Sequence, residues 1–201
     1  MLKVPPRGFK QIEFENRLIQ IQSLMHKEKI DAILLTTQVD IEYYTGFKTQ
    51  FLQSPTRPWY VLLPLNGKPQ AIIPIIGESG MKDTWVDDVK TWCSPNPEDE
   101  GITLLTSSIK TLMKKYKTLG IPQGHESNLR MPISDYLRLT FNLNNYEVKD
   151  VTNILRYVRY VKSKAEIEKI NYICQITSQG FKNLPSMLKE GESERANCQR
   201  F

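Results

Sequence analysis

The sequence predicts an α/β fold: a mixed sheet of about five to six strands, flanked by helices and followed by a long connecting helix. Short β-prone apolar runs alternate with amphipathic helical segments, which is the pattern of α/β proteins. Asn66-Gly67 joins two of these runs, and this dipeptide is a strong hairpin signal, so one pair of strands should be antiparallel. Ser163 and Glu166 have the spacing of a capping box, which predicts the start of a long helix.

The first part of the chain is expected to begin with a helix and to continue into the sheet. Over residues 11–26, apolar side chains recur at three- and four-residue intervals, which predicts an amphipathic helix. Residues 32–35 form a continuous apolar run, as in a parallel strand buried on both faces. Asp40 is the candidate N-cap of a short helix that Gly46 ends, and residues 50–58 are predicted to form a loop.

The second part is expected to complete the sheet. The hairpin strands should span residues 59–65 and 70–76, and Pro64, Pro69 and Pro74 should lie at strand ends or edges because proline has no backbone donor. The remaining pattern predicts helices over 77–88, 101–116 and 132–143, and strands over 89–93, 118–121 and 146–151.

The sequence changes in character after Asn153. The helix that starts at Ser163 should carry one apolar stripe, consisting of Ile167, Ile170, Ile173, Cys174 and Phe181. Pro185 is expected to interrupt this helix, and residues 192–201 resemble the opening of a further helix. We therefore predict an α/β domain over residues 1–153 and, over residues 154–201, a connector with the first helices of a second domain.

The composition is that of a soluble globular protein, with 40% hydrophobic residues, 24% charged residues and a mean hydropathy of −0.41. No apolar run approaches the roughly 20 residues needed to cross a bilayer. The basic start is not followed by the apolar segment of a secretory signal. We expect a cytoplasmic protein without membrane contact. Cys93, Cys174 and Cys198 are widely spaced, which favours reduced thiols over a disulfide framework or a zinc site.

A net charge of +5 raises the question of nucleic-acid binding. The dense basic cluster consists of Lys110, Lys114, Lys115 and Lys117. These residues fall largely on the outer face of the helix predicted over 101–116, where a solvated surface explains them. We therefore predict no nucleic-acid partner.

The sequence shows no metal-binding pattern. His26 and His125 are the two histidines, and neither belongs to an HExxH motif or to a carboxylate-histidine cluster with ligand spacing. His125 lies in a loop after a predicted strand, where an ordinary loop residue is the simplest interpretation. We predict neither a metal site nor a catalytic residue in this chain.

Three short segments carry a resemblance to one family. Residues 41–47 (Ile-Glu-Tyr-Tyr-Thr-Gly-Phe), residues 159–167 (Arg-Tyr-Val-Lys-Ser-Lys-Ala-Glu-Ile) and residues 188–194 (Leu-Lys-Glu-Gly-Glu-Ser-Glu) follow one another along the chain. They resemble the Y-x-T/S-G-F, R-x-x-K-S-x-x-E-I and L-x-x-G-x-x-E segments of the creatinase, aminopeptidase P and prolidase family. The chain therefore resembles the N-terminal domain of that family together with the start of the catalytic domain.

This resemblance implies a non-catalytic domain of a larger hydrolase. Family members hold two divalent metal ions, such as manganese, cobalt or zinc, with two Asp, one His and two Glu in the later catalytic domain. No such ligand is assigned to a residue here, and the chain alone is expected to be inactive. The resemblance also implies a homodimer in the full-length protein, and a substrate that is a peptide with a penultimate proline or a small amidine or amide.

Arg57 is the first candidate for substrate binding. It lies in a loop between Pro55 and Pro58, directly before a predicted strand, and such loops often carry function. The resemblance implies an arginine at this place that reaches the neighbouring subunit's active site and holds the substrate carboxylate, for which a guanidinium is well suited. The alternative is a surface arginine paired with an acidic residue.

Aromatic residues near this loop are further candidates. Trp59, Phe51 and Tyr44, together with Tyr43, could line a substrate entrance, because an aromatic wall suits a proline ring or a methylated amine. The alternative is a role in the core, where aromatic side chains beside strands are commonly found.

A different class of function remains compatible with the sequence. The chain could be a free-standing α/β module that binds a small carboxylate ligand or a partner protein through the loop containing Arg57. In that case the final helix should be packed and protected.

Overall fold

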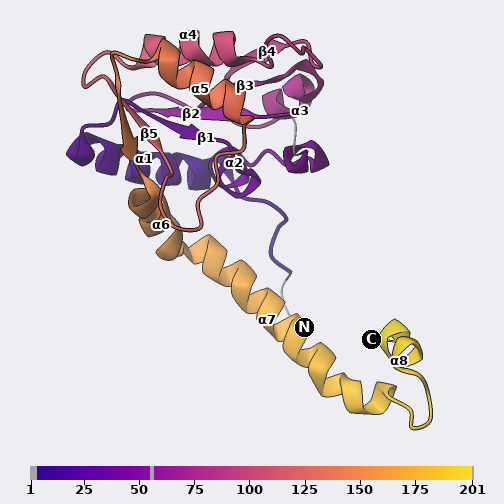
Figure 1. Cartoon of the computed structure of the whole chain (residues 1–201). Helices are drawn as coiled ribbons and strands as arrows, with labels where there is room; N and C mark the ends of the chain where they lie inside the picture. The colour runs from indigo at the N-terminus through magenta and orange to yellow at the C-terminus, as the bar shows by residue number, and fades with distance from the viewer. Residues whose placement is uncertain (1–3, 55–56, 201) are drawn as a thin grey trace. The chain divides into compact units, whose positions relative to one another are not determined.

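The computed structural model describes residues 4–54 and 57–200 (Figure 1). These residues form two compact units: a larger unit, Phe9–Tyr160, and a second unit made of residues 4–8 with residues 161–200. Pro55, which flanks the predicted Arg57 loop, lies outside the described residues. No helix in the described part of the chain is long and apolar enough to cross a membrane.

The larger unit is built on a six-stranded mixed sheet, counted over the described residues, with the order β4-β3-β2-β1-β5-β6. The strands are β1 (Ala32–Leu35), β2 (Tyr60–Pro64), β3 (Gln70–Pro74), β4 (Asp88–Trp92), β5 (Thr118–Ile121) and β6 (Glu147–Asp150). Strand β2 is antiparallel to both β1 and β3, and the other neighbouring pairs are parallel. The predicted mixed sheet and α/β fold are confirmed.

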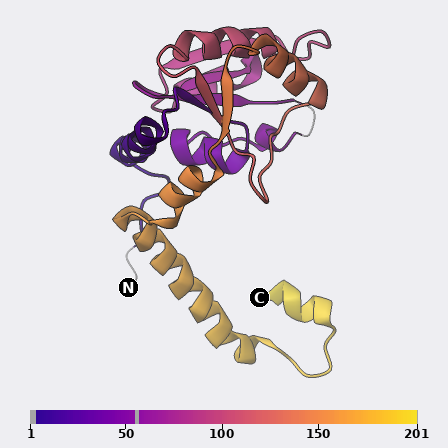
Figure 2. The same ribbon diagram turned by 60° about the vertical axis from the view of Figure 1, so that its left-hand side comes forward.

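Helices cover both faces of this sheet (Figure 1). Helices α1 (Gln11–Glu28), α2 (Gln38–Thr45), α3 (Glu78–Lys82) and α6 (Thr152–Tyr160) contribute to the core on one face. Helices α4 (Ile102–Leu112) and α5 (Ile133–Asn142) build the core on the other face. The turned view in Figure 2 shows the same layers.

The central strand β1 explains why its sequence is apolar throughout. Ile33 and Leu35 point into the core beneath α1 and α2, whereas Ala32 and Leu34 point into the core beneath α4 and α5. Both faces are covered because successive strand side chains point to opposite sides of a sheet. The prediction of a strand buried on both faces is confirmed.

The hairpin and its prolines also follow the prediction. Gly67 has a φ of 92° in the turn between β2 and β3, a conformation that glycine adopts without a steric penalty. Pro64 and Pro74 are the last residues of β2 and β3. Short 3₁₀ turns, η1 (Gln50–Gln53) and η2 (Ile75–Gly77), lie close to the hairpin in the sequence.

Several local predictions in the larger unit were wrong. The N-cap of α2 is Thr37 rather than Asp40: the Thr37 hydroxyl oxygen accepts the Asp40 N–H at 3.2 Å, so Asp40 lies inside the first turn. Helix α4 ends at Leu112, so that only Lys110 of the basic cluster lies on it; all four lysines are nevertheless exposed. The predicted loop over residues 50–58 contains the η1 turn.

The second unit contains α7 (Lys164–Met187) and α8 (Glu194–Arg200). Its capping box is confirmed: Ser163 Oγ accepts the Glu166 N–H at 3.1 Å, and a Glu166 carboxylate oxygen accepts the Ser163 N–H at 2.8 Å. Pro185 does not interrupt α7, which continues to Met187. No described residue of α7 is buried, and its predicted apolar stripe is exposed.

Helix α6 joins the larger unit because Leu155 and Val158 are buried in its core. The larger unit therefore runs on to Tyr160. The division of the chain into domains at residue 153 stays a prediction.

Candidate functional site

The order of the strands points to one edge of the sheet. Strands β1 and β5 are parallel neighbours, but the chain leaves β1 toward α2 on one face and leaves β5 toward α5 on the other. In α/β sheets, a crevice opens at the carboxyl ends of two such strands, and ligands commonly bind there. The residues after Leu35 and after Ile121 therefore frame the candidate site.

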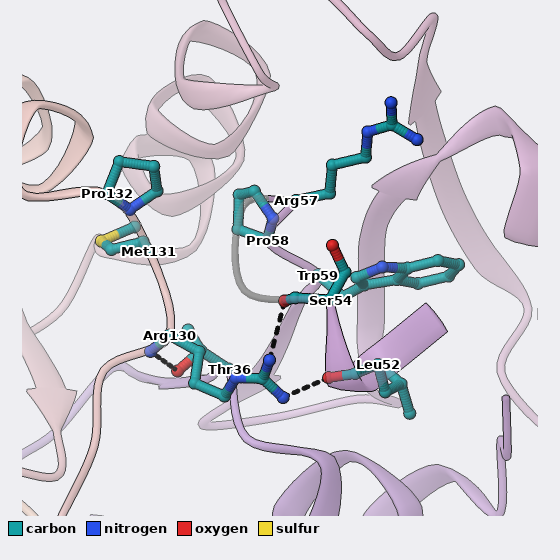
Figure 3. A pocket seen from close by; sticks show the side chains of 9 residues that line it. All are labelled: Thr36, Leu52, Ser54, Arg57, Pro58, Trp59, Arg130, Met131 and Pro132. Carbon is teal, nitrogen blue, oxygen red and sulfur yellow. Dashed lines mark hydrogen bonds between the residues drawn. The ribbon is translucent and has the colours of Figure 1, made fainter. Parts of the chain in front are cut away.

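One hollow at this edge contains Arg57 (Figure 3). Its lining consists of Thr36, Leu52, Ser54, Arg57, Pro58, Trp59, Arg130, Met131 and Pro132. The cavity measures about 10 Å³, which is room for about one water molecule. This hollow is a packed junction between loops and not a substrate pocket.

Arg130 holds that junction together. Its backbone N–H donates to the Thr36 hydroxyl oxygen at 2.9 Å. Its guanidinium donates to the backbone carbonyl of Ser54 at 2.7 Å and to that of Leu52 (Figure 3). One side chain thereby fixes the segment that leads to Arg57. No local pattern in the sequence predicts this role, because the carbonyls of Leu52 and Ser54 lie 78 and 76 residues away from Arg130 in the chain.

Arg57 itself is exposed, and its side chain extends away from Arg130 (Figure 3). The charge of Arg57 acts on the carboxyl group of Glu100. Burial would raise the pKa of the Glu100 carboxyl, but hydrogen bonds, above all from the Trp92 indole N–H, outweigh it, and the charge of Arg57 adds to the lowering. The pKa of Glu100 therefore lies below its usual range. Arg57 is accessible at the surface and lies within electrostatic reach of an acidic side chain.

The predicted aromatic residues divide into two groups. Tyr44 is fully buried, and this burial raises the pKa of its hydroxyl. Trp59 is 3% exposed and stacks on Phe47 with 5.6 Å between ring centroids. Both residues therefore belong to the core, which was the alternative interpretation of the sequence. Phe51 is 44% exposed. Substrate binding stays a prediction for all four residues, Arg57, Phe51, Trp59 and Tyr44.

A second hollow at the same edge is much larger, about 260 Å³. It lies wholly within the larger unit and is lined by Thr37, Val39, Asp40, Pro122, Glu126, Ser127, Asn128, Thr152, Leu155, Arg156 and Arg159. We call it the switch-point cavity, because it lies where the chain turns to opposite faces of the sheet after the neighbouring strands β1 and β5. Residues 37–40, after β1, form one wall, and residues 122–128, after β5, form another. No local sequence pattern marks this cavity, since its walls come from distant segments of the chain.

His125 lies beside this cavity in the loop after β5. The residue is exposed, and its backbone carbonyl accepts a hydrogen bond from the Arg156 guanidinium. His125 thus contacts Arg156 through its backbone carbonyl and not through its imidazole.

Within residues 4–54 and 57–200, no three His, Cys, Asp or Glu side chains gather closely enough to hold a metal ion. Cys93, Cys174 and Cys198 are exposed free thiols. The described residues therefore do not fit the dinuclear centre that the sequence resemblance implies for the larger protein, and no chemical step is assigned to a metal in this chain.

Comparison with protein families decides the affiliation. Residues 17–161 match the Creatinase/Prolidase N-terminal domain. The chain belongs to this family. The match covers the larger unit from within α1 to just after α6.

Two curated relatives match this chain with similar sequence identity and over a similar length. An uncharacterised peptidase of Staphylococcus epidermidis is 25% identical over 179 residues, which is 89% of this chain and 46% of the relative. One of Staphylococcus saprophyticus is 26% identical over 181 residues, again 89% of this chain and 46% of the relative. The chain thus spans about half the length of the curated relatives that it matches.

Solved structures share the fold. A prolidase from Thermococcus sibiricus superimposes with a TM-score of 0.74 at 21% identity, over 95% of this chain and 49% of the other. The dipeptidase PepE from Mycobacterium ulcerans gives 0.73 at 19% identity, over 96% and 48%. A proline dipeptidase from Streptococcus pneumoniae gives 0.58 at 19% identity, over 72% of this chain and 98% of the other.

Proposed function

We propose that this chain is the non-catalytic N-terminal domain of a dinuclear-metal hydrolase of the Xaa-Pro peptidase or creatinase kind. In this proposal it contributes to dimerisation and to substrate access. The observation that carries the proposal is the family match over residues 17–161, in a chain that covers 46% of a curated peptidase. Two divalent metal ions would be held by residues outside this chain.

The surface around Arg57 supports a role in substrate access. Arg57 lines one hollow together with Leu52 and Pro58. Phe51, which belongs to the same η1 turn as Leu52, is 44% exposed. A cation beside apolar surface suits a ligand that carries a carboxylate next to an apolar group, such as the end of a small peptide.

A chimeric enzyme tests this function. The remaining C-terminal part of the Staphylococcus epidermidis peptidase would be joined after Phe201, and hydrolysis of Xaa-Pro dipeptides would be measured with manganese. We expect turnover by the chimera and none by this chain alone. We expect Arg57→Ala to raise KM at least tenfold with a smaller change in kcat. Lys48→Ala removes another exposed cation of the same region and serves as the matched control.

Two results would contradict the proposal. Metal-dependent turnover by the chain alone would remove the non-catalytic role, and equal effects of the Arg57 and Lys48 variants would remove the role of Arg57. Sedimentation of the chimera checks dimerisation, for which a monomer at assay concentration is the contrary result.

A second candidate function is a free-standing module that binds a small carboxylate or a partner protein through the Arg57 loop. It is favoured by the Streptococcus pneumoniae structure, which this chain covers over 98% of its length, so that a domain of this extent exists as a solved chain. Hydrogen exchange distinguishes the two candidates. Strong protection of residues 192–200 supports the free-standing module, whereas rapid exchange there supports the first proposal.

A further inference from the structure

We propose that the switch-point cavity binds a small organic carboxylate and that Arg156 is the side chain that holds the carboxylate group. This inference goes beyond the proposed function, because it concerns a different place from the Arg57 loop and requires no catalytic domain.

The size and lining of the cavity suit a small amphipathic molecule. Its volume of about 260 Å³ equals that of several water molecules at about 30 Å³ each, in contrast to the hollow beside Arg57. Val39, Pro122 and Leu155 supply apolar surface. Ser127, Asn128 and Thr37 supply polar groups. Ligand sites combine apolar walls with a few polar groups in this manner.

The charges around the cavity leave one cation without close compensation. Asp40 and Arg159 neutralise each other, because one carboxylate oxygen of Asp40 lies 3.2 Å from Arg159 Nη1. The other oxygen accepts the Thr37 hydroxyl at 2.6 Å, and the Asp40 side chain is only 10% exposed. This buried carboxylate is therefore fully engaged within the protein.

Arg156 is in a different position. Among the described residues, Arg156 forms an ion pair with Glu126, whose carboxylate lies 4.0 Å from Arg156 Nη2 and whose side chain is 89% exposed. An ion pair of this length between solvated groups contributes about 0 to 1 kcal/mol. An incoming carboxylate can replace it at low cost.

The guanidinium of Arg156 is also held in place. It donates a hydrogen bond to the backbone carbonyl of His125, which belongs to the loop forming one wall of the cavity. A guanidinium carries five N–H donors, so this bond leaves others to meet a ligand. An oriented guanidinium beside apolar surface binds a carboxylate with two parallel hydrogen bonds.

The same charges favour a monoanion over a dianion. Of the two arginines that line the cavity, Arg159 is already paired with Asp40, so a second negative charge on the ligand would meet no further uncompensated cation there. Phosphate also gains nothing from Val39 and Leu155. The chemical class is therefore a carboxylic acid with a short apolar body.

Titration of the full chain tests this inference. Backbone amide NMR spectra would be recorded at pH 7 and constant ionic strength with isovalerate, with its uncharged analogue isovaleramide, and with inorganic phosphate. We expect saturable shifts with isovalerate at a Kd on the order of 1 mM, centred on Ser127, Asn128 and Leu155. We expect isovaleramide and phosphate to bind at least tenfold more weakly.

Two arginine variants complete the test. Arg156→Gln should weaken isovalerate binding at least tenfold. Arg138→Gln is the matched control, since the Arg138 guanidinium also donates to a backbone carbonyl, that of Glu98 at 2.8 Å, and this variant should bind isovalerate as the wild type does. Arg57→Ala should also leave the affinity unchanged, which separates this inference from the proposed function.

Three results would overturn the inference: equal binding of isovaleramide or phosphate, undiminished binding by Arg156→Gln, or shifts confined to the Arg57 loop. If Arg156→Gln does not fold, the three wild-type titrations alone decide, because absence of saturable isovalerate binding equally overturns it.

Discussion

Apolar side chains are buried in the sheet of the larger unit but exposed on helix α7. Ile72 of β3 and Ile170 of α7 both belong to apolar patterns in the sequence, yet Ile72 is 0% exposed and Ile170 is 44% exposed. An apolar pattern determines which face of an element needs to be buried. It does not supply the partner: Ile72 packs in the core that α4 and α5 help to build, whereas no described residue of α7 is buried.

The largest expected effect compares these two isoleucines directly. Ile72→Ala should lower the free energy of unfolding by about 4 kcal/mol, because it leaves a cavity in the core. Ile170→Ala should change it by less than about 0.5 kcal/mol. Urea unfolding followed by tryptophan fluorescence measures both, since the three tryptophans lie in the larger unit. A large loss for Ile170→Ala would show that α7 is buried in solution, and its dependence on protein concentration would reveal self-association.

The second test concerns a carboxylate that joins distant segments of the larger unit. Asp31 is 2% exposed and accepts the backbone N–H groups of Lys115, Tyr116 and Thr118 at 3.0, 2.7 and 3.3 Å. Asp31→Ala should cost about 3 kcal/mol, because it leaves these donors without an acceptor. Asp31→Asn keeps one acceptor oxygen and should cost less. If both variants unfold at the wild-type urea concentration, these bonds do not stabilise the unit.

The third test uses one glycine from each region. A Cβ at position 120 would lie 2.5 Å from Val151 Cγ1 and 3.0 Å from Ile33 Cγ1. Gly120→Ala should therefore cost about 2 kcal/mol through overpacking. Gly180→Ala, within α7, should leave the fluorescence-monitored transition in place and raise helicity in circular dichroism. If wild type and Gly120→Ala unfold at the same urea concentration, the side chains around β5 can move to accommodate the added methyl group.

The smallest expected effect depends on pH. Burial would raise the pKa of the Asp150 carboxyl, but hydrogen bonds from the Thr152 hydroxyl and from nearby backbone N–H groups outweigh it and lower this pKa. Because the folded-state pKa is lowered, the stabilisation is fully present above the ordinary aspartate pKa of about 3.9 and is lost as pH falls through the folded value.

Asp150→Asn should therefore lower stability at pH 7 by less than about 1 kcal/mol, since the group is solvent-screened. The difference from wild type should shrink as pH falls below about 4. Urea midpoints at pH 7, 5 and 3 measure it, and a difference that grows toward pH 3 would contradict the assignment.

Local signals in the sequence predicted local structure well. The Asn66-Gly67 turn and the Ser163 capping box depend on residues within a few positions of one another, and both are confirmed. The N-cap of α2 was misplaced because Thr37 and Asp40 are both good N-caps, and the sequence does not say which of them has extended backbone.

The site was harder to predict for a physical reason. Arg130 acquires its role from the carbonyls of Leu52 in η1 and of Ser54 just after it. The switch-point cavity is formed by residues after β1, after β5 and on α6. These segments meet only through the strand order of the sheet, which no local pattern encodes. Arg57 could be selected as a candidate because a loop before a hairpin is visible in the sequence, and its role stays a prediction; the full burial of Tyr44 was not visible.

The pairing of β1 with β5 has a consequence for how the larger unit assembles. Hairpin β2–β3 closes over a short turn, but the Asp31 contact to Thr118 closes a loop of 87 residues. Distant contacts form more slowly than local ones, because the chain entropy of closing the loop must be overcome first. We therefore expect the switch-point cavity to appear late in folding, after the hairpin. A carboxylate bound there would select the finished fold and stabilise it in proportion to the logarithm of its concentration.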